Sequence, residues 1–137
     1  MLCINCLHSK TAVINSRTHS KAAQVWRRRQ CAECDKVFTT YERVSTGDEL
    51  ICQTISGNKV AYSFGQLLLD IAACFDHAPS KRADKAYWLA KTVEDQLIAS
   101  GKTNLTTKLI AKTVHQVMLP FDNFAAVQFA ARHNKLV

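Results

Sequence analysis

Two Cys-x-x-Cys pairs constrain the fold of this chain more than any other feature of its sequence. The first pair is Cys3 and Cys6, and the second is Cys31 and Cys34. Two cysteines at this spacing in a tight turn can place both sulfurs on one metal ion, and two such turns supply four soft ligands. Four thiolates in a tetrahedral set select zinc and leave no open coordination position. The pattern therefore predicts a structural zinc site that folds the segment between the pairs.

The expected redox state of the thiols favours metal binding over disulfide formation. The N-terminal residues lack the basic start, the apolar core and the small-residue cleavage site of a secretion signal. We therefore expect a cytoplasmic protein, in which thiols stay reduced. The alternatives, a redox pair or buried small side chains, have no other support in the sequence. His8 could replace one ligand, whereas Cys52 and Cys74 lie on expected apolar faces and are interpreted as core residues.

Positive charge is unevenly distributed along the 137 residues, a length that suffices for one ordinary domain or two small ones. Residues 1–45 contain eight of the 18 Lys and Arg residues and three of the 11 acidic residues. Residues 46–137 contain ten basic and eight acidic residues. A small module with such an excess is typical of polyanion binding, although the charge can also serve solubility alone. No apolar stretch approaches the roughly 18 residues of a membrane span, so we expect no membrane partner.

A run of three arginines is separated from the second cysteine pair by Gln30 alone. Consecutive side chains of a strand point to opposite faces, so at least one face of a strand here presents arginines. Guanidinium groups suit phosphate oxygens and the acceptor edge of guanine. We therefore predict a DNA-binding surface, with a solvated charged strand as the simpler alternative. Its candidate residues are Arg17, Lys21, Arg27, Arg28, Arg29, Tyr41 and Arg43.

The residue pattern predicts an α+β protein with a domain boundary near Ser45. Residues 11–17, 22–30 and 36–44 are expected to be strands, the last because it is rich in β-branched and aromatic residues. Three short strands and two cysteine turns make a zinc ribbon over residues 1–45. Because so small a ribbon has little apolar surface, we expect the metal to supply folding energy.

Residues 46–137 are predicted to form a short hairpin followed by helices. Ser56-Gly57-Asn58 is a turn signal between two short strands. Ser63 and Gln66 have the spacing of a capping box at the start of the first helix. Apolar residues at helical spacing predict three further helices, at residues 84–100, 107–119 and 122–133.

No catalytic constellation is recognisable in the sequence. The histidines show no paired ligand spacing, and neither a Ser-His-Asp set nor a phosphate-binding Gly-rich loop is recognisable. Neighbouring acidic residues, such as Glu94 and Asp95, are interpreted as solvated surface. We therefore do not expect an enzyme.

Four segments, in order, resemble the NrdR family, bacterial transcriptional repressors of ribonucleotide reductase genes. They are the first cysteine pair, Asn15-Ser16-Arg17, the segment from Arg27 to Cys34, and Phe38-Thr39-Thr40-Tyr41-Glu42-Arg43. The resemblance is most specific over residues 3–44, and the helical half is similar in length and layout. It implies a zinc ribbon joined to an ATP-cone, a hairpin-plus-helices domain that binds ATP or dATP.

The expected ATP-cone departs from the family pattern on its hairpin. Family members carry a Val-x-Lys-Arg-Asp-Gly-type stretch whose basic residues meet the phosphates. Here Thr54 and Ile55 stand at the two basic positions, and Gln128 replaces an arginine of the final helix. The resemblance leaves Gly57 and Lys59 as candidate nucleotide-binding residues. We therefore expect nucleotide binding to be altered or lost, with the domain serving oligomerisation.

The resulting hypothesis is a zinc-ribbon transcriptional regulator that binds double-stranded DNA as a homo-oligomer. Two alternatives stay open. The first is an interaction or oligomerisation module that does not bind DNA. The second is a nucleotide-sensing accessory subunit with ATP or dATP as its ligand.

Overall fold

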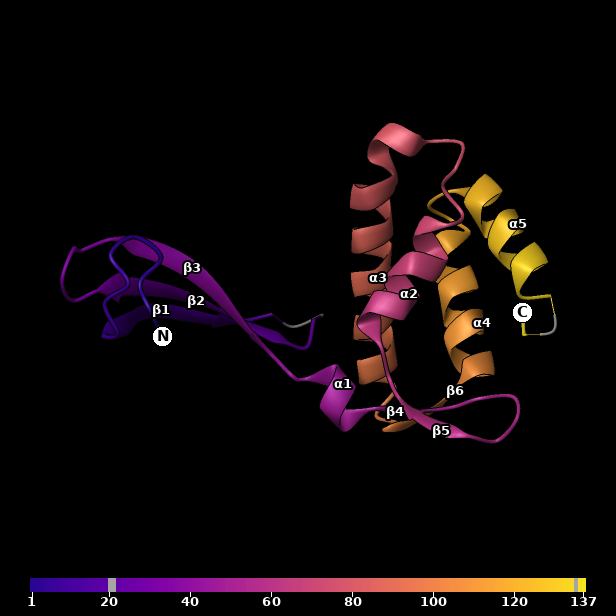
Figure 1. Ribbon diagram of the computed structural model, residues 1–137, viewed down its shortest axis with the longest axis horizontal. Helices are drawn as coiled ribbons and strands as arrows, with labels where there is room; N and C mark the ends of the chain where they lie inside the picture. The colour runs from indigo at the N-terminus through magenta and orange to yellow at the C-terminus, as the bar shows by residue number, and fades with distance from the viewer. Residues whose placement is uncertain (20–21, 135) are drawn as a thin grey trace. The chain divides into compact units, whose positions relative to one another are not determined.

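The computed structural model describes residues 1–19, 22–134 and 136–137, which divide into two compact units (Figure 1). The first unit is Met1–Val44 and the second is Ser45–Val137. The first contains an antiparallel sheet, and the second contains the helices of the described residues together with a small mixed sheet. The α+β class predicted from the sequence is confirmed.

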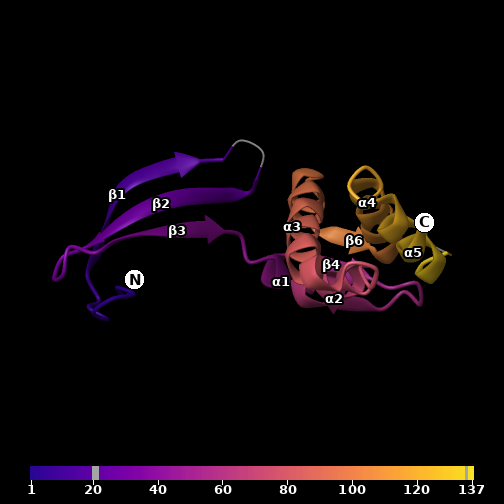
Figure 2. The same cartoon turned by 90° about the horizontal axis from the view of Figure 1, so that it is seen from above.

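The sheet of the first unit has three antiparallel strands that lie in the order of the chain (Figure 2). They are β1 (Thr11–Thr18), β2 (Gln24–Cys31) and β3 (Val37–Arg43). The central strand β2 pairs along its length with both neighbours. A bulge between Val13 and Asn15 shifts the register of β1, and from Asn15 onward the strands form continuous cross-strand rows.

The first unit has a very small apolar core. Its buried residues are Cys3, Cys31 and Phe38, and Cys34 packs against them. Leu7, the residue after Cys6, adds nothing to this core, because it is 72 % exposed. So little buried apolar surface does not offset the conformational entropy of ordering three strands. The cysteines must therefore contribute more than packing to the stability of this unit.

The second unit combines a three-stranded sheet with packed helices. Its strands are β4 (Ile51–Gln53), β5 (Lys59–Ala61) and β6 (Asn104–Thr106). Its helices are α1 (Thr46–Glu49), α2 (Phe64–Ala72), the 3-10 helix η1 (Pro79–Lys81), α3 (Arg82–Ala99), α4 (Thr107–Met118) and α5 (Asn123–Arg132). The central strand β4 is antiparallel to β5 and parallel to β6. Within the described residues, no helix combines the length and apolar character needed to cross a membrane.

One apolar core joins the helices of the second unit to its sheet. Helix α3 packs against both α2 and α4. Phe75, Ile71 and Leu105 are among the largest fully buried side chains. The apolar stripe predicted for α3 is buried at every position, namely Ala86, Leu89, Ala90, Val93 and Leu97. Helical periodicity therefore identified these apolar positions correctly, but the interpretation of Glu94 as solvated surface is wrong, because Glu94 is buried and accepts a hydrogen bond from Thr46 Oγ1 at 2.8 Å.

Side-chain caps begin three of the helices. Ser63, Thr106 and Asp122 are the N-caps of α2, α4 and α5, and each accepts a hydrogen bond from a backbone N–H of the first turn. Ser63 Oγ accepts from the Gln66 N–H at 3.2 Å, as the capping-box spacing predicts. The reciprocal half of the box does not form, because the Gln66 amide donates to Asp70 Oδ1 at 2.9 Å instead.

Three short elements were not predicted from the sequence: α1, η1 and β6. Strand β6 has only three residues, so it shows no alternation that a pattern could reveal. Its partner β4 lies far away in the chain, and Leu105 pairs with Cys52 across the parallel ladder. Leu105 is fully buried, so tertiary packing determines this strand.

The N-cap of α5 predicts a loss of stability in acid. Asp122 accepts from the Ala125 N–H at 3.0 Å and lies 3.1 Å from His77 Nε2 and 3.3 Å from Lys85 Nζ. The backbone N–H of Ala125, together with these two side chains, holds the pKa of Asp122 below its usual value of about 4. Because the folded pKa is below the unfolded one, this stabilisation is complete above about pH 4. It is lost as the pH falls through the folded pKa.

Urea unfolding at a series of pH values, followed by the helical circular dichroism signal, measures this loss. Asp122→Asn should flatten the decline in unfolding free energy below about pH 4. Asp84→Asn is a matched control, because Asp84 is an exposed carboxylate in the first turn of α3. An unchanged acid slope in Asp122→Asn would contradict the prediction.

Candidate zinc centre and nucleic-acid interface

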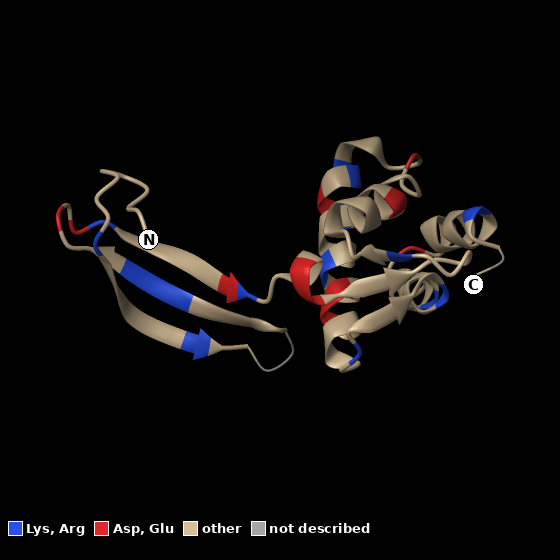
Figure 3. Cartoon of the chain, turned by 60° about the horizontal axis from the view of Figure 1, so that its bottom comes forward, with Lys and Arg blue, Asp and Glu red and all other residues tan. Residues whose placement is uncertain are grey.

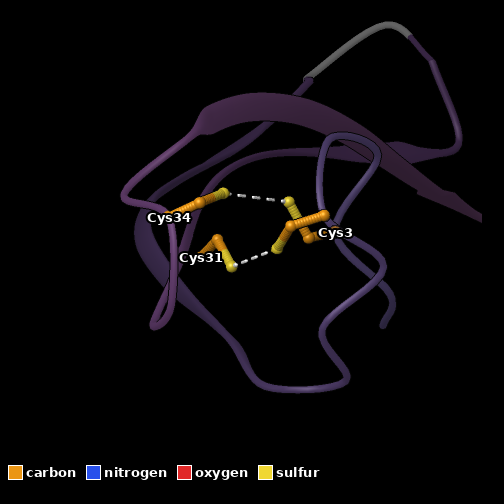
Figure 4. A group of neighbouring side chains, drawn as sticks. Cys3, Cys31 and Cys34 are labelled. Atoms are coloured by element: carbon orange, nitrogen blue, oxygen red, sulfur yellow. Dashed lines mark hydrogen bonds between the residues drawn. The ribbon is translucent and has the colours of Figure 1, made fainter.

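The four predicted zinc ligands come together in the first unit (Figure 4). Their Sγ atoms all lie within 4.8 Å of one another. Cys3 Sγ is 3.7 Å from Cys34 Sγ, and Cys6 Sγ is 3.6 Å from Cys31 Sγ. Zn–S bonds of about 2.3 Å in a tetrahedron place the sulfurs about 3.8 Å apart. The spacing and the four soft donors fit one zinc ion, which is the structural cofactor of this unit.

Both cysteine turns have the same backbone design. The N–H of Asn5 points at Cys3 Sγ, and the N–H of Glu33 points at Cys31 Sγ, each at 3.4 Å. The residue after the second cysteine has a positive φ in both turns, 61° at Leu7 and 56° at Asp35. Hydrogen bonds donated to sulfur favour the thiolate form that a metal requires. The two turns therefore present their sulfurs in matched geometry.

The crowding of the four sulfurs calls for a compensating cation. The backbone N–H of Lys36 lowers the pKa of Cys34 to about 6, and the side chain of Asn5 contributes. The backbone of His8 lowers the pKa of Cys6, but desolvation and the neighbouring thiols outweigh it and raise that pKa to about 12. Without a metal ion, the four cysteine thiols are therefore not all deprotonated at neutral pH. A bound divalent cation supplies the charge that stabilises them.

The register of the sheet separates the three consecutive arginines. Directly opposed residues of an antiparallel sheet share a face, and successive residues of one strand alternate between faces. We define the Arg28 face by two rows of opposed residues, Asn15–Arg28–Thr39 and Arg17–Trp26–Tyr41. We define the Arg27 face by the rows Ser16–Arg27–Thr40 and Val13–Arg29–Phe38.

The Arg28 face is open to solvent. Arg28 is exposed, and its Nη1 donates to Thr39 Oγ1 at 3.1 Å. The guanidinium carbon of Arg17 lies 5.8 Å from the ring centroid of Trp26. Tyr41, on the other side of Trp26, is 59 % exposed. Figure 3 shows the basic band across the central strand. The face thus combines an exposed guanidinium with one that is held against an aromatic ring.

On the Arg27 face, the arginine side chains contact other residues of the first unit. Arg27 Nη2 lies 2.9 Å from Glu42 Oε2, and Arg29 Nε donates to Thr40 Oγ1 at 3.3 Å. Phe38 on this face is buried with the zinc cysteines. Arg27 Nε is buried and has no hydrogen-bond partner among the described residues. The structure therefore does not bring Arg27 and Arg29 together with Arg28.

The remaining candidate residues lie at several places in the chain. Arg43 Nη1 donates to Gln24 Oε1 at 2.7 Å, and the register puts this pair on the side of the Arg28 face. Lys21 lies outside the described residues. Gly57, with a φ of 87°, forms the turn between β4 and β5, and Lys59 is an exposed residue at the start of β5. Gly57 and Lys59 are thus on the hairpin of the second unit.

Sequence reasoning did not single out Asn15, Thr39 and Gln24 as neighbours of the basic residues. The face of a residue on β1 or β3 depends on its register with β2, which is a non-local property. The bulge after Val13 changes that register within β1. The sequence shows which residues of one strand share a face. It does not show which residues of β1 and β3 lie beside the arginines of β2.

Comparison with known proteins identifies the family. Residues 1–42 match the family described as "Transcriptional repressor NrdR-like, N-terminal domain". A protein named Transcriptional repressor NrdR from Lactobacillus delbrueckii subsp. bulgaricus is 32% identical over 133 residues, which span 96% of this chain and 83% of the relative. A protein of the same name from Bordetella avium is 33% identical over 134 residues, spanning 96% of this chain and 81% of the relative. Another from Burkholderia mallei is 29% identical over 135 residues, spanning 98% and 84%. The resemblance found in the sequence is confirmed, and the chain belongs to the NrdR family.

Proposed function

We propose that the chain is a zinc-dependent transcriptional repressor that binds double-stranded DNA through the Arg28 face. The names of the relatives support a regulator of transcription over an enzyme. One observation carries the proposal: Arg17 and Arg28 lie on one open face of a sheet anchored by four zinc-binding cysteines.

The chemistry of this face suits a nucleic acid. A guanidinium group offers paired donors to a phosphate or to the O6 and N7 acceptors of guanine. Stacking against Trp26 restricts Arg17 before DNA arrives, so less side-chain entropy is lost on binding. Each phosphate neutralised also releases counterions, which makes binding salt-dependent with a slope of about −0.9 per contact.

We further infer a division of labour between the two parts of the chain. Residues 1–45 would bind DNA, and residues 46–137, an ATP-cone-like domain by resemblance, would set the oligomeric state. A homo-oligomer presents several ribbons, so paired sites on one duplex would be bound more tightly than a single site. Sedimentation of the zinc-loaded protein without DNA tests this part separately.

Two neighbouring arginines provide a matched test of the interface. Arg28→Ala and Arg27→Ala each remove one positive charge, but from opposite faces of β2. We expect Arg28→Ala to weaken binding by about tenfold or more and Arg27→Ala by much less, since a specific arginine contact contributes about 1–3 kcal/mol. If Arg28 contacts a phosphate, its variant should also lower the salt slope by about 1. Fluorescence anisotropy with duplexes selected from a random library by the wild-type protein measures both effects.

Zinc content and circular dichroism must be equal in both variants for the comparison to count. Equal losses, or a larger loss in Arg27→Ala, would show that the assignment of the face is wrong. If the wild-type protein selects no duplex at all, the chain is not a DNA-binding regulator. Pull-down partners found without DNA would then favour the interaction module.

A further inference from the structure

A cavity of about 410 Å³ lies in the second unit, between the sheet and the helices. Its size is within the range of small-molecule sites in proteins. The lining comes from β4, the hairpin, α2, α4, α5 and the residues after α5. Leu67, Ile110, Val114, Phe129 and Leu136 are among its apolar lining residues. The wall is therefore mostly aliphatic and aromatic.

Several polar side chains at this cavity already have partners inside the protein, whereas Tyr62 Oη, also at the cavity, is buried without a hydrogen-bond partner among the described residues. Ser63 Oγ accepts the capping hydrogen bond from the Gln66 N–H at 3.2 Å. The Gln66 amide in turn donates to the Asp70 carboxylate at 2.9 Å. Thr54 Oγ1 lies 2.9 Å from Ser56 Oγ and accepts from the Asn58 N–H at 3.1 Å within the hairpin. Tyr62 Oη and the ring of His133 thus remain as polar lining groups for a ligand, in a wall that is otherwise mostly apolar.

The charge of the cavity does not favour a polyphosphate. Among the described lining residues there is no lysine or arginine, and Asp70 contributes a negative charge. Lys108 lines a separate smaller hollow of about 290 Å³ that shares Thr54 and Thr107 with the cavity. Lys59 lines neither hollow. A nucleoside triphosphate carries several negative charges, and burial without matching cations is costly.

The hairpin also lacks cations at the two positions that the family pattern makes basic. Thr54 lines it, and Ile55 is 74 % exposed on the adjoining turn. These are the two positions at which the family pattern has basic residues. The nucleotide that the family resemblance implies therefore does not fit the residues present here.

We propose that this cavity binds an uncharged small molecule with a mainly apolar body, in place of ATP or dATP. The apolar wall supplies the free energy of binding, and the low number of unpaired polar groups disfavours ligands that need many hydrogen bonds. The proposal concerns the second unit alone and does not rest on the proposed DNA binding. Failure of either test leaves the other proposal intact.

The probe for this site is N-phenyl-1-naphthylamine, an uncharged dye whose fluorescence increases in apolar surroundings. Titration of the full zinc-loaded chain should show saturable binding of one dye per chain. Val60→Trp should raise the dissociation constant by about tenfold or more, because Val60 lines the cavity, is 49 % exposed and pairs with Cys52, a buried lining residue, across the ladder. Ile51→Trp is the matched control, since Ile51 precedes Cys52 on β4, faces the opposite side of the sheet and does not line the cavity.

A second variant and a competition experiment complete the test. Gln66→Trp, at an exposed lining position of α2, should weaken dye binding as Val60→Trp does, with helical circular dichroism unchanged in both. Millimolar Mg-ATP or Mg-dATP should leave the dye bound. Displacement by either nucleotide would overturn the proposal. So would a lack of saturable dye binding, or binding that both tryptophan variants leave unchanged.

Discussion

Zinc removal is expected to unfold the first unit and to leave the helices of the second unit folded. Among its described residues, the first unit buries Cys3, Cys31 and Phe38 alone, with Cys34 partly covered. Structural zinc sites of small domains contribute roughly 10–16 kcal/mol of apparent binding free energy at neutral pH, which exceeds the stability of most domains. The second unit has its own large apolar core and shares none of the four ligands.

Chelation followed by two-dimensional NMR separates the two outcomes residue by residue. Amide signals of β1, β2 and β3 should collapse to unfolded positions, while those of α2, α3 and α4 should keep their dispersion. Because the proposed DNA contacts of Arg17 and Arg28 depend on the folded sheet, DNA affinity should fall by about a hundredfold or more, toward non-specific binding. Readdition of zinc should restore both.

Single-cysteine variants test the same prediction without a chelator. Cys31→Ser removes a buried ligand and should abolish stoichiometric zinc. Cys52→Ser is the matched control, because Cys52 is also a buried cysteine on a strand but lies outside the cluster. It should keep one zinc per chain. A folded first unit in Cys31→Ser, or in the chelated protein, would contradict the structural role of the metal.

Phe75→Ala is expected to have the largest effect of any single substitution in the second unit. Its side chain is fully buried, and its ring faces His77 at a centroid distance of 5.7 Å and Lys85 Nζ at 5.4 Å. Truncation of a buried phenylalanine to alanine costs about 3–5 kcal/mol, because apolar transfer energy is lost and a cavity remains. That is a large fraction of the 5–15 kcal/mol typical of a whole domain.

Urea unfolding of the zinc-loaded protein, followed at the helical circular dichroism band, measures this effect. The band reports the second unit, because the helices of the described residues all lie there. Phe124→Ala is the control, since Phe124 is 56 % exposed and should cost less than about 1 kcal/mol. Equal costs in the two variants would show that the core is not organised around Phe75.

Features that depend on short-range spacing could be predicted from the sequence. The cysteine quartet follows from two identical short motifs, and the structure places all four sulfurs together. The stripes of α2 and α3 follow from helical periodicity, and their apolar positions form the core. Each cysteine pair lies within one tight loop and each stripe lies within one helix, while the joining of the two pairs follows from the four ligands that a zinc ion takes.

Features that depend on pairing between distant segments could not be predicted. Alternation along β2 already separates Arg28 from Arg27 and Arg29, but which face is open and which makes contacts within the unit depends on the register of three strands. Strand β6 exists because Leu105 is buried beside Cys52, which lies in a different part of the chain. The cavity likewise collects residues from β4 to the end of the chain, and no local pattern marks it.

The final residue of β2, Cys31, is also a zinc ligand. The metal fixes which side of the sheet Cys31 faces. It therefore determines which side every other residue of β2 faces, in addition to stabilising the strand. Arg28 lies an odd number of residues before this ligand and so faces away from it. A one-residue insertion between them would exchange the open and the engaged arginines, because each residue of a strand reverses the side. As long as the strand keeps its alternation, length changes between Arg28 and Cys31 would preserve the proposed binding face only in pairs of residues.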